Sequence, residues 1–484
     1  MEIIGRERER HILTRCENSE KPEFLAVYGR RRVGKTFLIA EHFGNKFAFS
    51  LTGVSGGSMK DQLRAFHAAL KKHFKTEAPI PADWFEAFTL LGERIEDDIT
   101  SNRKVLFIDE MPWLDTPKSK FIQALEHFWN SFASRRKDVM LIVCGSAASW
   151  IVNKLLDNYG GLHNRVTETI VVEPFLLSDC EAFYRSRGIA MNRQQMAEAY
   201  MILGGIPFYM DAMDRMYGLN QNIDLLLFGK NAKLGNEFGR LYHSLFRYAD
   251  NHMRIAETLS AKTGGMTRQE LSATSGIPDG GGLTKTLAEM EACGLLGRSF
   301  DYKKKKNGDY FKLTDFFSMF YFKFIKTQKG KDPHFWTNFL SYPAHRAWCG
   351  YAFERLCMAH IHQIKQKLGI AGVITETYAF RSAPRRGMQK SGTQQETAGA
   401  QIDLVIDRKD GVINLCECKF HGQPYALTGA DIADFERKKA GFLEETGTKK
   451  AIHMTMITAN GLIRNAYCNE IQSEITLDDL FSRQ

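Results

Sequence analysis

Residues 29 to 36 read Gly29-Arg30-Arg31-Arg32-Val33-Gly34-Lys35-Thr36, a stretch that fits the phosphate-binding pattern G-x-x-x-x-G-K-[S/T]. The apolar run at residues 24–28 before it predicts a short buried strand, and residues 37–42 after it predict a helix. A strand, a glycine loop and a helix N-terminus point backbone N–H groups and the positive helix end at an anion. Lys35 would reach the β- and γ-phosphates of a nucleotide, and the Thr36 hydroxyl would ligate Mg²⁺. The plainer alternative is a glycine turn whose lysine has no ligand.

A second motif is the apolar run at residues 105–108, which is followed by Asp109 and Glu110. A central parallel strand delivers acids to its carboxyl edge in this way. We expect Asp109 to hold Mg²⁺, and Glu110 to polarise the water that attacks the γ-phosphate. A third apolar run at residues 140–144 leads to Ser146, which would bond that water or the γ-phosphate, or would only cap a helix.

The length of 484 residues allows three or four domains, and 44% hydrophobic with 25% charged residues is ordinary for a globular protein. The sequence opens without an apolar leader and has no uncharged apolar run of about 18 residues, so we expect neither export nor a membrane partner. The nine cysteines are scattered through mostly apolar segments, which favours reduced thiols in a cytoplasmic protein.

The net charge of +9 favours a polyanionic partner only mildly in so long a chain, but its distribution is uneven. Nine lysines fall between residues 303 and 331 against two aspartates, and aromatic residues are interleaved with them. This stretch predicts an element that faces nucleic acid, with a solvated hairpin as the alternative. The lysines are Lys303, Lys304, Lys305, Lys306, Lys312, Lys323, Lys326, Lys329 and Lys331.

Strand patterns alternate with helix patterns up to about residue 175, which predicts the parallel α/β sheet of a P-loop NTPase. The strands are expected at 24–28, 47–51, 105–108, 140–144 and 167–172, and helices at stretches such as 58–74 and 119–134. We divide the chain into a P-loop ATPase domain (1–175), a helical lid (176–250), a winged-helix domain (251–335) and a C-terminal α/β domain (340–484).

The third of these domains is predicted from three helices that are followed by a hairpin. This order is typical of a winged helix-turn-helix, which commonly binds DNA but also serves as a lid or a dimer contact. The helices are expected at 254–259, from a capping Thr267 onward, and at 283–290, and the hairpin strands at 295–299 and 310–313.

The last domain is predicted as a mixed α/β fold. We expect a helix at 345–368, strands at 373–379, 401–407 and 412–419, a helix at 429–444, a strand at 450–457 and a helix at 461–472. The segment 381–400 is rich in Arg, Gln, Gly, Ser and Thr and is predicted to be a mobile insert.

Acidic residues gather on the predicted strands of this domain. With a strand period of two, Glu417 and Lys419 share one face, and Asp403 could meet Glu417 from the neighbouring strand. Glu354, on the preceding helix, could add a third acid. Such acids bind Mg²⁺ or Mn²⁺ in phosphodiesterases, where a lysine steadies the water or the transition-state charge. A cross-strand ion pair is the alternative, and the chance triplet Glu436-Arg437-Lys438, on an expected amphipathic helix, shows how easily E-x-K arises.

Taken together, these residues resemble the STAND-type AAA+ NTPases of the archaeal ATPase family, which carry a nuclease-like C-terminal domain. The resemblance covers nearly the whole chain, and the C-terminal domain is similar to PD-(D/E)xK nucleases, with Ile402 in the place of the motif's proline. Its markers are Ile3-Ile4-Gly5-Arg6-Glu7, the loop 29–36, Asp109-Glu110 with Pro112, Gly145-Ser146, Gly205-Ile206-Pro207, Gly350-Tyr351-Ala352-Phe353-Glu354, Asp403 and Glu417-Cys418-Lys419.

The resemblance implies further roles. Gly5 and Arg6 should lie beside the adenine and ribose, the turn at Pro207 should close over the base, and Arg165 should sense the γ-phosphate, although Asn164 replaces the family's glycine before it. The restriction-endonuclease-like domain would bind its metal through Glu354, Asp403 and Glu417. The implied nucleotide-binding set is Gly5, Arg6, Gly29, Arg30, Arg31, Arg32, Val33, Gly34, Lys35, Thr36, Phe37 and Pro207.

The sequence therefore predicts an ATP-binding and ATP-hydrolysing switch that is coupled to a DNA-binding C-terminal domain, with DNA cleavage left open. One alternative is a regulatory STAND-type NTPase whose winged helix and nuclease-like domain only bind DNA or protein. Another is a chaperone-like AAA+ ring, which the lack of a clear arginine finger disfavours. A homo-oligomer stays open.

Overall fold

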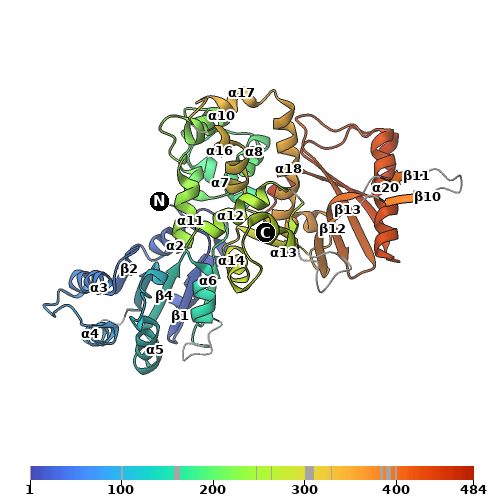
Figure 1. Ribbon diagram of the computed structural model, residues 1–484. Helices are drawn as coiled ribbons and strands as arrows, with labels where there is room; N and C mark the ends of the chain where they lie inside the picture. The colour runs from blue at the N-terminus through green and yellow to red at the C-terminus, as the bar shows by residue number, and fades with distance from the viewer. Residues whose placement is uncertain are drawn as a thin grey trace. The chain divides into compact units, whose positions relative to one another are not determined.

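A computed structural model of the chain places most of the predicted strands in two five-stranded sheets (Figure 1). The structure describes residues 2–99, 102–156, 164–246, 248–262, 264–299, 310–328, 330–381, 385–388, 394–397 and 400–483. Contacts between residues group the chain into two units, which are described separately. Unit 1 is Met1–Pro174, Leu241–Ala249 and Ala288–Gly294, and unit 2 is Phe175–Arg240, Asp250–Leu287 and Leu295–Gln484.

The sheet of unit 1 is parallel throughout, with the strand order β2-β3-β4-β1-β5. Every residue of β3 and β4 is buried, as expected for central strands that are covered on both faces. The parallel α/β sheet predicted from the sequence is thereby confirmed. The strands are β1 (Glu23–Tyr28), β2 (Phe49–Thr52), β3 (Lys104–Asp109), β4 (Val139–Gly145) and β5 (Glu168–Val171).

Helices pack their apolar faces against this sheet around a core rich in aromatic residues. The Trp84 ring lies 4.8 Å from that of Phe121, and Phe66 packs against Trp84 at 5.9 Å. Ser58 and Asp61 form a capping box at the start of α3. The helices are α1 (Glu7–Glu17), α2 (Lys35–His42), α3 (Met59–Phe74), α4 (Trp84–Glu96), α5 (Phe121–Ser131) and α6 (Ala148–Ile151).

Unit 2 begins with a helical segment whose sharpest turn is at Gly204 and Gly205. Both have positive φ, and a Cβ at Gly205 would stand 2.3 Å from the carbonyl oxygen of Phe175, so glycine is required there. The helices are α7 (Leu177–Ser186), α8 (Arg193–Leu203), α9 (Pro207–Met210), α10 (Leu219–Ile223) and α11 (Glu237–Leu245), whose last residues belong to unit 1.

Three helices and a small antiparallel sheet follow, in the order that the sequence predicts. Thr267 caps α13 in a capping box with Glu270, so the expected capping threonine is confirmed. The tip of the hairpin, with Lys303 to Lys306, lies outside the described residues. The elements are α12 (Asp250–Ser260), β6 (Met266–Thr267), α13 (Arg268–Ser275), α14 (Gly281–Ala292), β7 (Leu296–Ser299) and β8 (Tyr310–Leu313), with the strand order β6-β8-β7.

The second five-stranded sheet is mixed, with the order β15-β14-β13-β12-β9. Strands β9, β12 and β13 are antiparallel neighbours, whereas β13, β14 and β15 run parallel. A β-hairpin, β10 (Arg385–Met388) with β11 (Gln394–Thr397), occupies part of the insert, and the rest of that predicted mobile segment lies largely outside the described residues. The remaining elements are α15 (Phe316–Phe320), α16 (Lys326–Gln328), α17 (Phe335–Phe339), α18 (Pro343–Ala359), α19 (Ile361–Lys367), β9 (Thr375–Arg381), β12 (Gln401–Arg408), β13 (Val412–Lys419), α20 (Gly429–Thr446), β14 (Ala451–Thr458) and β15 (Ser473–Thr476).

One helix prediction in this domain is wrong, and another is confirmed except for a break at one residue. The expected helix at 461–472 is a short 3-10 helix, Ala466–Glu470, capped by Asn465, and the chain then pairs with β14 as strand β15. The expected helix at 345–368 is present as α18 and α19, with a break at His360, whose ring accepts a hydrogen bond from the Leu177 N–H. Both departures from the predictions lie where the chain contacts a distant segment.

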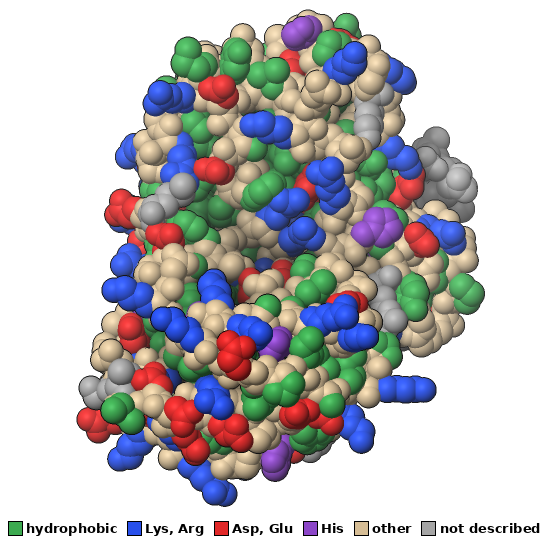
Figure 2. All heavy atoms as spheres, turned by 90° about the vertical axis from the view of Figure 1, so that its left-hand side faces the viewer, with side chains coloured by type: hydrophobic (Ala, Val, Ile, Leu, Met, Phe, Trp, Pro, Cys, Tyr) green, Lys and Arg blue, Asp and Glu red, His purple; other side chains and the backbone are tan. Residues whose placement is uncertain are grey.

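Positive and negative side chains are mixed on the face that Figure 2 shows. Figure 2 shows a face on which Lys and Arg side chains are interspersed with Asp and Glu rather than gathered in one patch. Within the predicted lysine patch, Lys312 lines a small cavity beside Arg355 and Arg381, where its burial lowers its pKa to about 8. Lys326 pairs with Glu257, and Lys329 lies outside the described residues. No helix in the described part of the chain is long and apolar enough to cross a membrane.

Candidate active sites

The phosphate-loop sequence forms a tight turn between β1 and α2. Arg32 and Gly34 have φ values of 70° and 90°, in the left-handed region. At Gly29 a Cβ would come within 2.1 Å of the carbonyl oxygen of Val172 on the neighbouring chain segment, so only glycine fits. Helix α2 starts at Lys35 directly after the turn, so the unpaired N–H groups of its first turn adjoin the loop. The local backbone is therefore suited to an anion.

Lys35 is buried at the centre of this site. Its Nζ donates to the carbonyl oxygens of Gly29 (3.0 Å) and Arg30 (2.7 Å) and to Ser146 Oγ (3.1 Å). Burial lowers the pKa of Lys35, and the nearby Cys144, Glu110 and Asp109 act in the opposite direction. Among the described residues no carboxylate bonds Lys35 Nζ, so this ammonium group can attract a phosphate.

Asp109 and Glu110, at the end of β3, make hydrogen bonds near the loop. Asp109 Oδ2 accepts a 2.9 Å hydrogen bond from Thr36 Oγ1. Glu110 accepts from the Ser146 hydroxyl (2.9 Å) and from the Ser146 N–H (3.3 Å). Glu110 also has a φ of 46°, a strained backbone for a residue with a side chain, of the kind that clusters at functional sites. One hydrogen-bonded chain thus runs from Glu110 through Ser146 to Lys35.

The N-terminal marker lies against the other side of the loop. Gly5 and Arg6 both have positive φ, and Arg6 Nη2 donates to the carbonyl oxygen of Val33 at 3.1 Å. Arg30 is buried and lies against Gly294, two residues after the end of α14, because a Cβ built on Gly294 would be 3.5 Å from Arg30 Cδ. The structure therefore brings the N-terminal segment and the turn that follows α14 to the same loop.

Four of the residues predicted for the nucleotide site take no part in the hydrogen bonds of this network within the described part of the chain. Phe37 is 38% exposed on α2, and Arg31 is half-buried. Arg165 is exposed in the turn before β5, and among the described residues no hydrogen bond joins it to the loop. Pro207 is the first residue of α9 and belongs to unit 2.

A second group of acids lies on the sheet of unit 2. Leu404 on β12 pairs with Cys416 on β13, which places Asp403 beside Glu417 on adjacent strands. Asp403 Oδ2 accepts a 3.0 Å hydrogen bond from the Cys418 N–H, which fixes its carboxylate against β13. The predicted meeting of these two acids follows from the antiparallel register.

Glu417 is held between two lysines. Lys419 Nζ bonds Oε1 at 2.9 Å, and Lys438 Nζ, from α20, bonds Oε2 at 2.7 Å. Lys438 also pairs with Asp434 at 3.0 Å. Burial alone would lower the pKa of Lys419, but the Glu417 carboxylate outweighs it and raises that pKa.

Glu354 approaches from α18, and the charges of Asp403 and Glu417 act on it. Burial raises the pKa of Glu354 to about 7, with repulsion from Asp403 as the next cause. Burial and repulsion from Glu417 raise the pKa of Asp403 to about 6. Within the described ranges, no group of three or more His, Cys, Asp or Glu is already arranged as a metal cage.

These residues face one cavity of about 580 Å³, here called the carboxylate cavity. Four predicted site residues line it, together with basic and aromatic side chains and two residues of α8. The predicted members are Glu354, Asp403, Glu417 and Lys419.

The phosphate loop and its partners can be compared with known proteins. A family model described as an ATPase domain predominantly from Archaea matches residues 4–213. Those residues are an archaeal-type P-loop ATPase domain. The matched range covers the sheet of unit 1 and extends through α7 to α9, so it includes Pro207.

Individual relatives are distant. The uncharacterised protein MJECL04 of Methanocaldococcus jannaschii is 25% identical over 325 residues, which are 67% of this chain and 69% of that protein. Among solved structures, the Walker-type ATPase PABY2304 of Pyrococcus abyssi aligns with 66% of this chain and 96% of its own, at 16% identity and a TM-score of 0.46. The ORC2 protein of Aeropyrum pernix, in its ADPNP–ADP complexes, aligns with 74% of this chain and 96% of its own, at 12% identity and a TM-score of 0.43.

The sequence analysis did not predict two features of the carboxylate cavity. One is Lys438, and the other is the contribution of Gln194 and Glu198, the two residues of α8 that line the cavity. The triplet at 436–438 was interpreted as a chance E-x-K, yet Lys438 is only 8% exposed and bonds Glu417. A lysine on the apolar face of α20, beside Phe435 and Phe442, is the signal that could have revealed it, because buried lysines need a partner. No local signal marks α8, since its role depends on tertiary packing.

Proposed function

We propose that this chain binds and hydrolyses ATP at the phosphate loop, and that its nucleotide state controls a DNA-binding and DNA-cleaving unit 2. The observation that carries the first part is the hydrogen-bonded chain Glu110–Ser146–Lys35 in an archaeal-type ATPase domain. It joins a buried cation, a hydroxyl and a carboxylate at the start of a helix, which are the groups that phosphoryl transfer to water requires.

Binding and positioning follow from the loop. The N–H groups at the start of α2 and the Lys35 ammonium would hold the phosphates, and Lys35 would exchange its bonds to Gly29, Arg30 and Ser146 for phosphate oxygens. Thr36 Oγ1 and Asp109 Oδ2 are 2.9 Å apart and are the oxygen donors that Mg²⁺ prefers, so these two residues fit the ion. Mg²⁺ bound there would supply charge neutralisation on the phosphates.

Glu110 would act as the general base. It now accepts two hydrogen bonds from Ser146, so its carboxylate is held on β4 rather than left free for a water molecule. When Lys35 leaves Ser146 for a phosphate, the Ser146 hydroxyl loses one partner and can turn toward the γ-phosphate. This rearrangement would free Glu110 to take a proton from the attacking water.

The same loop offers a route to the rest of the chain. Arg30 lies against Gly294, two residues after the end of α14, the third helix of the predicted winged helix. A change in the loop on ATP binding would therefore press on the end of that helix. A two-state response of this kind needs a contact that differs between the nucleotide-bound and free forms, and Arg30 supplies a candidate.

The second part of the proposal rests on the carboxylate cavity. Burial, and after it repulsion from a neighbouring acid, raises the pKa values of Glu354 and Asp403 to about 7 and 6, and a divalent cation would offset both the burial of these charges and their repulsion. Their oxygens would hold Mg²⁺ or Mn²⁺, an ion that would supply a Lewis acid for phosphodiester cleavage. Lys419, which faces the cavity and holds Glu417, would stabilise the charge that develops on the phosphate.

One observation favours a second candidate, a unit 2 that binds DNA without cutting it. Both oxygens of Glu417 already accept from lysines, so a metal ligated by Glu417 would have to displace Lys419 or Lys438. In the binding-only case the cavity would serve as a docking site, and the lysines would neutralise its acids.

The test measures ATP hydrolysis and DNA cutting on the same preparations. We expect Glu110→Gln to bind ATP normally but to lose hydrolysis by about a hundredfold or more, because the general base is removed. Asp403→Asn should abolish cutting of labelled DNA in Mg²⁺ or Mn²⁺ and leave ATP hydrolysis intact. Hydrolysis by wild type without any cutting would support the binding-only candidate, and normal hydrolysis by Glu110→Gln would contradict the ATPase assignment.

A further inference from the structure

The carboxylate cavity has a wall that lies outside its strand motif. Gln194 and Glu198 line it from α8, within the range that matches the ATPase family. They are four residues apart and so share one face of the helix. Gln194 Nε2 donates to Glu198 Oε1 at 3.3 Å, which orients both side chains. Two hydrogen-bonding groups of α8 therefore adjoin the acids of β12 and β13.

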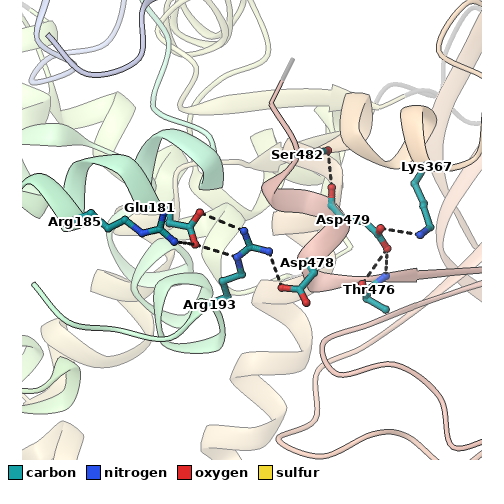
Figure 3. A network of polar contacts seen from close by, with 8 residues as sticks. All are labelled: Glu181, Arg185, Arg193, Lys367, Thr476, Asp478, Asp479 and Ser482. Carbon is teal, nitrogen blue, oxygen red and sulfur yellow. Dashed lines mark hydrogen bonds and ion pairs between the residues drawn. The ribbon is translucent and has the colours of Figure 1, made fainter.

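Arg193 fixes this helix to the C-terminal domain, as Figure 3 shows. Its Nη1 donates to Asp478 Oδ1 at 3.0 Å, and its Nε donates to Glu181 Oε1 at 3.0 Å. The guanidinium also lies 4.7 Å from the centre of the Phe481 ring. Arg193 thus joins α7 and α8 to the last residues of the chain.

Two further bonds hold the same helices. The Leu177 N–H, at the start of α7, donates to His360 Nε2 at 3.0 Å, and the Tyr200 ring of α8 stands 5.2 Å from the His360 ring. Asn460 Nδ2 donates to Gln194 Oε1 at 3.2 Å. All of these residues belong to unit 2, so the α8 wall is part of the same folded body as the acids.

The charges around the cavity differ between α8 and the other elements. Cations come from β13, α18 and β9, as Lys419, Arg346 and Arg381. Acids also come from α18, β12 and β13, as Glu354, Asp403 and Glu417, but the α8 wall offers an amide and a carboxyl group and no cation. A phosphate would be attracted to the cations of the other elements, so the α8 wall suits the uncharged part of a nucleotide. A cavity of about 580 Å³ is of the size that holds a small organic molecule.

We propose that Gln194 and Glu198 contact the substrate and select an unpaired nucleobase that carries an amino group, while Lys419, Arg346 and Arg381 hold its phosphate. This inference rests on the proposed binding of nucleic acid by unit 2. A carboxyl oxygen accepts from the amino group of cytosine, whereas thymine presents an oxygen at the same position. The hydrogen-bonding edge of a base is free for such a contact only when the base is unpaired.

The test is the binding of labelled oligo(dC) and oligo(dT) to the full chain, in EDTA so that no strand is cut. Wild type should prefer oligo(dC) by about tenfold, the usual effect of one base contact. Glu198→Gln should remove the preference, because its amide can donate to thymine as well as accept from cytosine. Gln194→Ala should reduce the preference in part. Glu470→Gln and Gln366→Ala, at exposed positions of unit 2, are the matched controls and should behave as wild type.

Each outcome is decisive. Equal binding of the two oligonucleotides by wild type would overturn the inference whether or not the variants fold, as would an unchanged preference in Glu198→Gln. Lys419→Ala should weaken the binding of both oligonucleotides to the same extent, because it removes a phosphate contact. Loss of base selection alone would change their relative affinities instead. Wild type that binds neither strand would overturn DNA binding by unit 2 and this inference with it, whereas binding without selection overturns the inference alone.

Discussion

The phosphate loop and the carboxylate cavity both bury a lysine near acids, but they use it differently. Lys35 donates to two carbonyl oxygens and a hydroxyl, and neither Asp109 nor Glu110 bonds it. In the cavity, Lys438 bonds Glu417 directly. A lysine on neutral acceptors can exchange them for a phosphate, whereas one in a buried ion pair leaves an uncompensated carboxylate if it moves. This difference agrees with the proposal that Lys35 binds a ligand, whereas Lys438 holds a buried carboxylate of the fold.

The largest expected effect is a loss of ATP turnover when Lys35, but not Lys438, is replaced. Lys35→Ala should lower ATP turnover by about a thousandfold, because it removes the cation that stabilises the phosphates in the transition state. The free energy of unfolding should change little, since no carboxylate loses a bonded partner. Lys46→Ala, at an exposed position of the same unit, is the control and should keep wild-type turnover in a steady-state assay. If Lys35→Ala lost turnover only because it unfolded, the proposed difference between Lys35 and Lys438 would be contradicted.

The second effect is on stability. Lys438→Ala should destabilise the protein by about 3 kcal/mol, because Glu417 and Asp434 lose a buried partner. ATP turnover at a temperature well below unfolding should stay normal. Urea unfolding, followed by circular dichroism, would measure the free energy of unfolding. Lys439→Ala, on the more exposed side of α20, is the control. Equal stability of the two variants would show that the Lys438 pair is not a structural bond.

A third effect depends on pH and concerns the hydrogen bond between the Leu177 N–H, at the start of α7, and His360, at the end of α18. Burial lowers the pKa of His360 to about 4, below its usual 6.5, so the unfolded chain binds the proton more readily. The stability that the neutral ring contributes is therefore full above pH 6.5 and is lost as the pH falls toward 4. We expect a loss of about 2 kcal/mol between pH 6.5 and 5.

The difference between wild type and His360→Gln isolates this group, because the carboxyl groups of the cavity titrate in the same range in both proteins. His362→Gln, at an exposed position, should keep the wild-type dependence on pH. A parallel dependence in wild type and His360→Gln would mean that the ring is not the group responsible.

The smallest effect tests the N-terminal support of the loop. Arg6→Ala removes the bond to the Val33 carbonyl oxygen, which leaves the loop less well held. Loss of one such bond should raise KM for ATP about fivefold and leave kcat nearly unchanged. Steady-state kinetics would measure both constants, and Arg8→Ala, at an exposed position of α1, is the control. A fall in kcat at unchanged KM would place Arg6 in the chemistry instead.

The two sites also differ in how far the sequence predicts them. The P-loop sheet follows from short buried apolar runs, and Lys35, Thr36, Asp109 and Ser146 come from strand ends that a parallel sheet must bring together. The register of β12 and β13 was similarly accessible, because a single turn at Gly411 sets it.

The remaining features depend on docking between distant segments. Lys438 reaches Glu417 only because α20 packs on β13, and α8 reaches the cavity through Arg193 and Asp478, which are far apart in the chain. The prediction of a helix at 461–472 is wrong in a stretch that likewise contacts distant residues, since Leu462 forms a bridge with Tyr425 and its N–H donates to Glu474. Local periodicity carries no information about such partners.

Measurement of DNA binding with and without a non-hydrolysable ATP analogue tests whether the nucleotide at the phosphate loop controls unit 2. The affinity of labelled DNA for wild type should change several-fold when the analogue and Mg²⁺ are added, and should not change in Lys35→Ala. Glu417→Ala should alter DNA binding or cutting and leave ATP hydrolysis intact. The same DNA affinity in every nucleotide state of the wild-type protein would contradict the account.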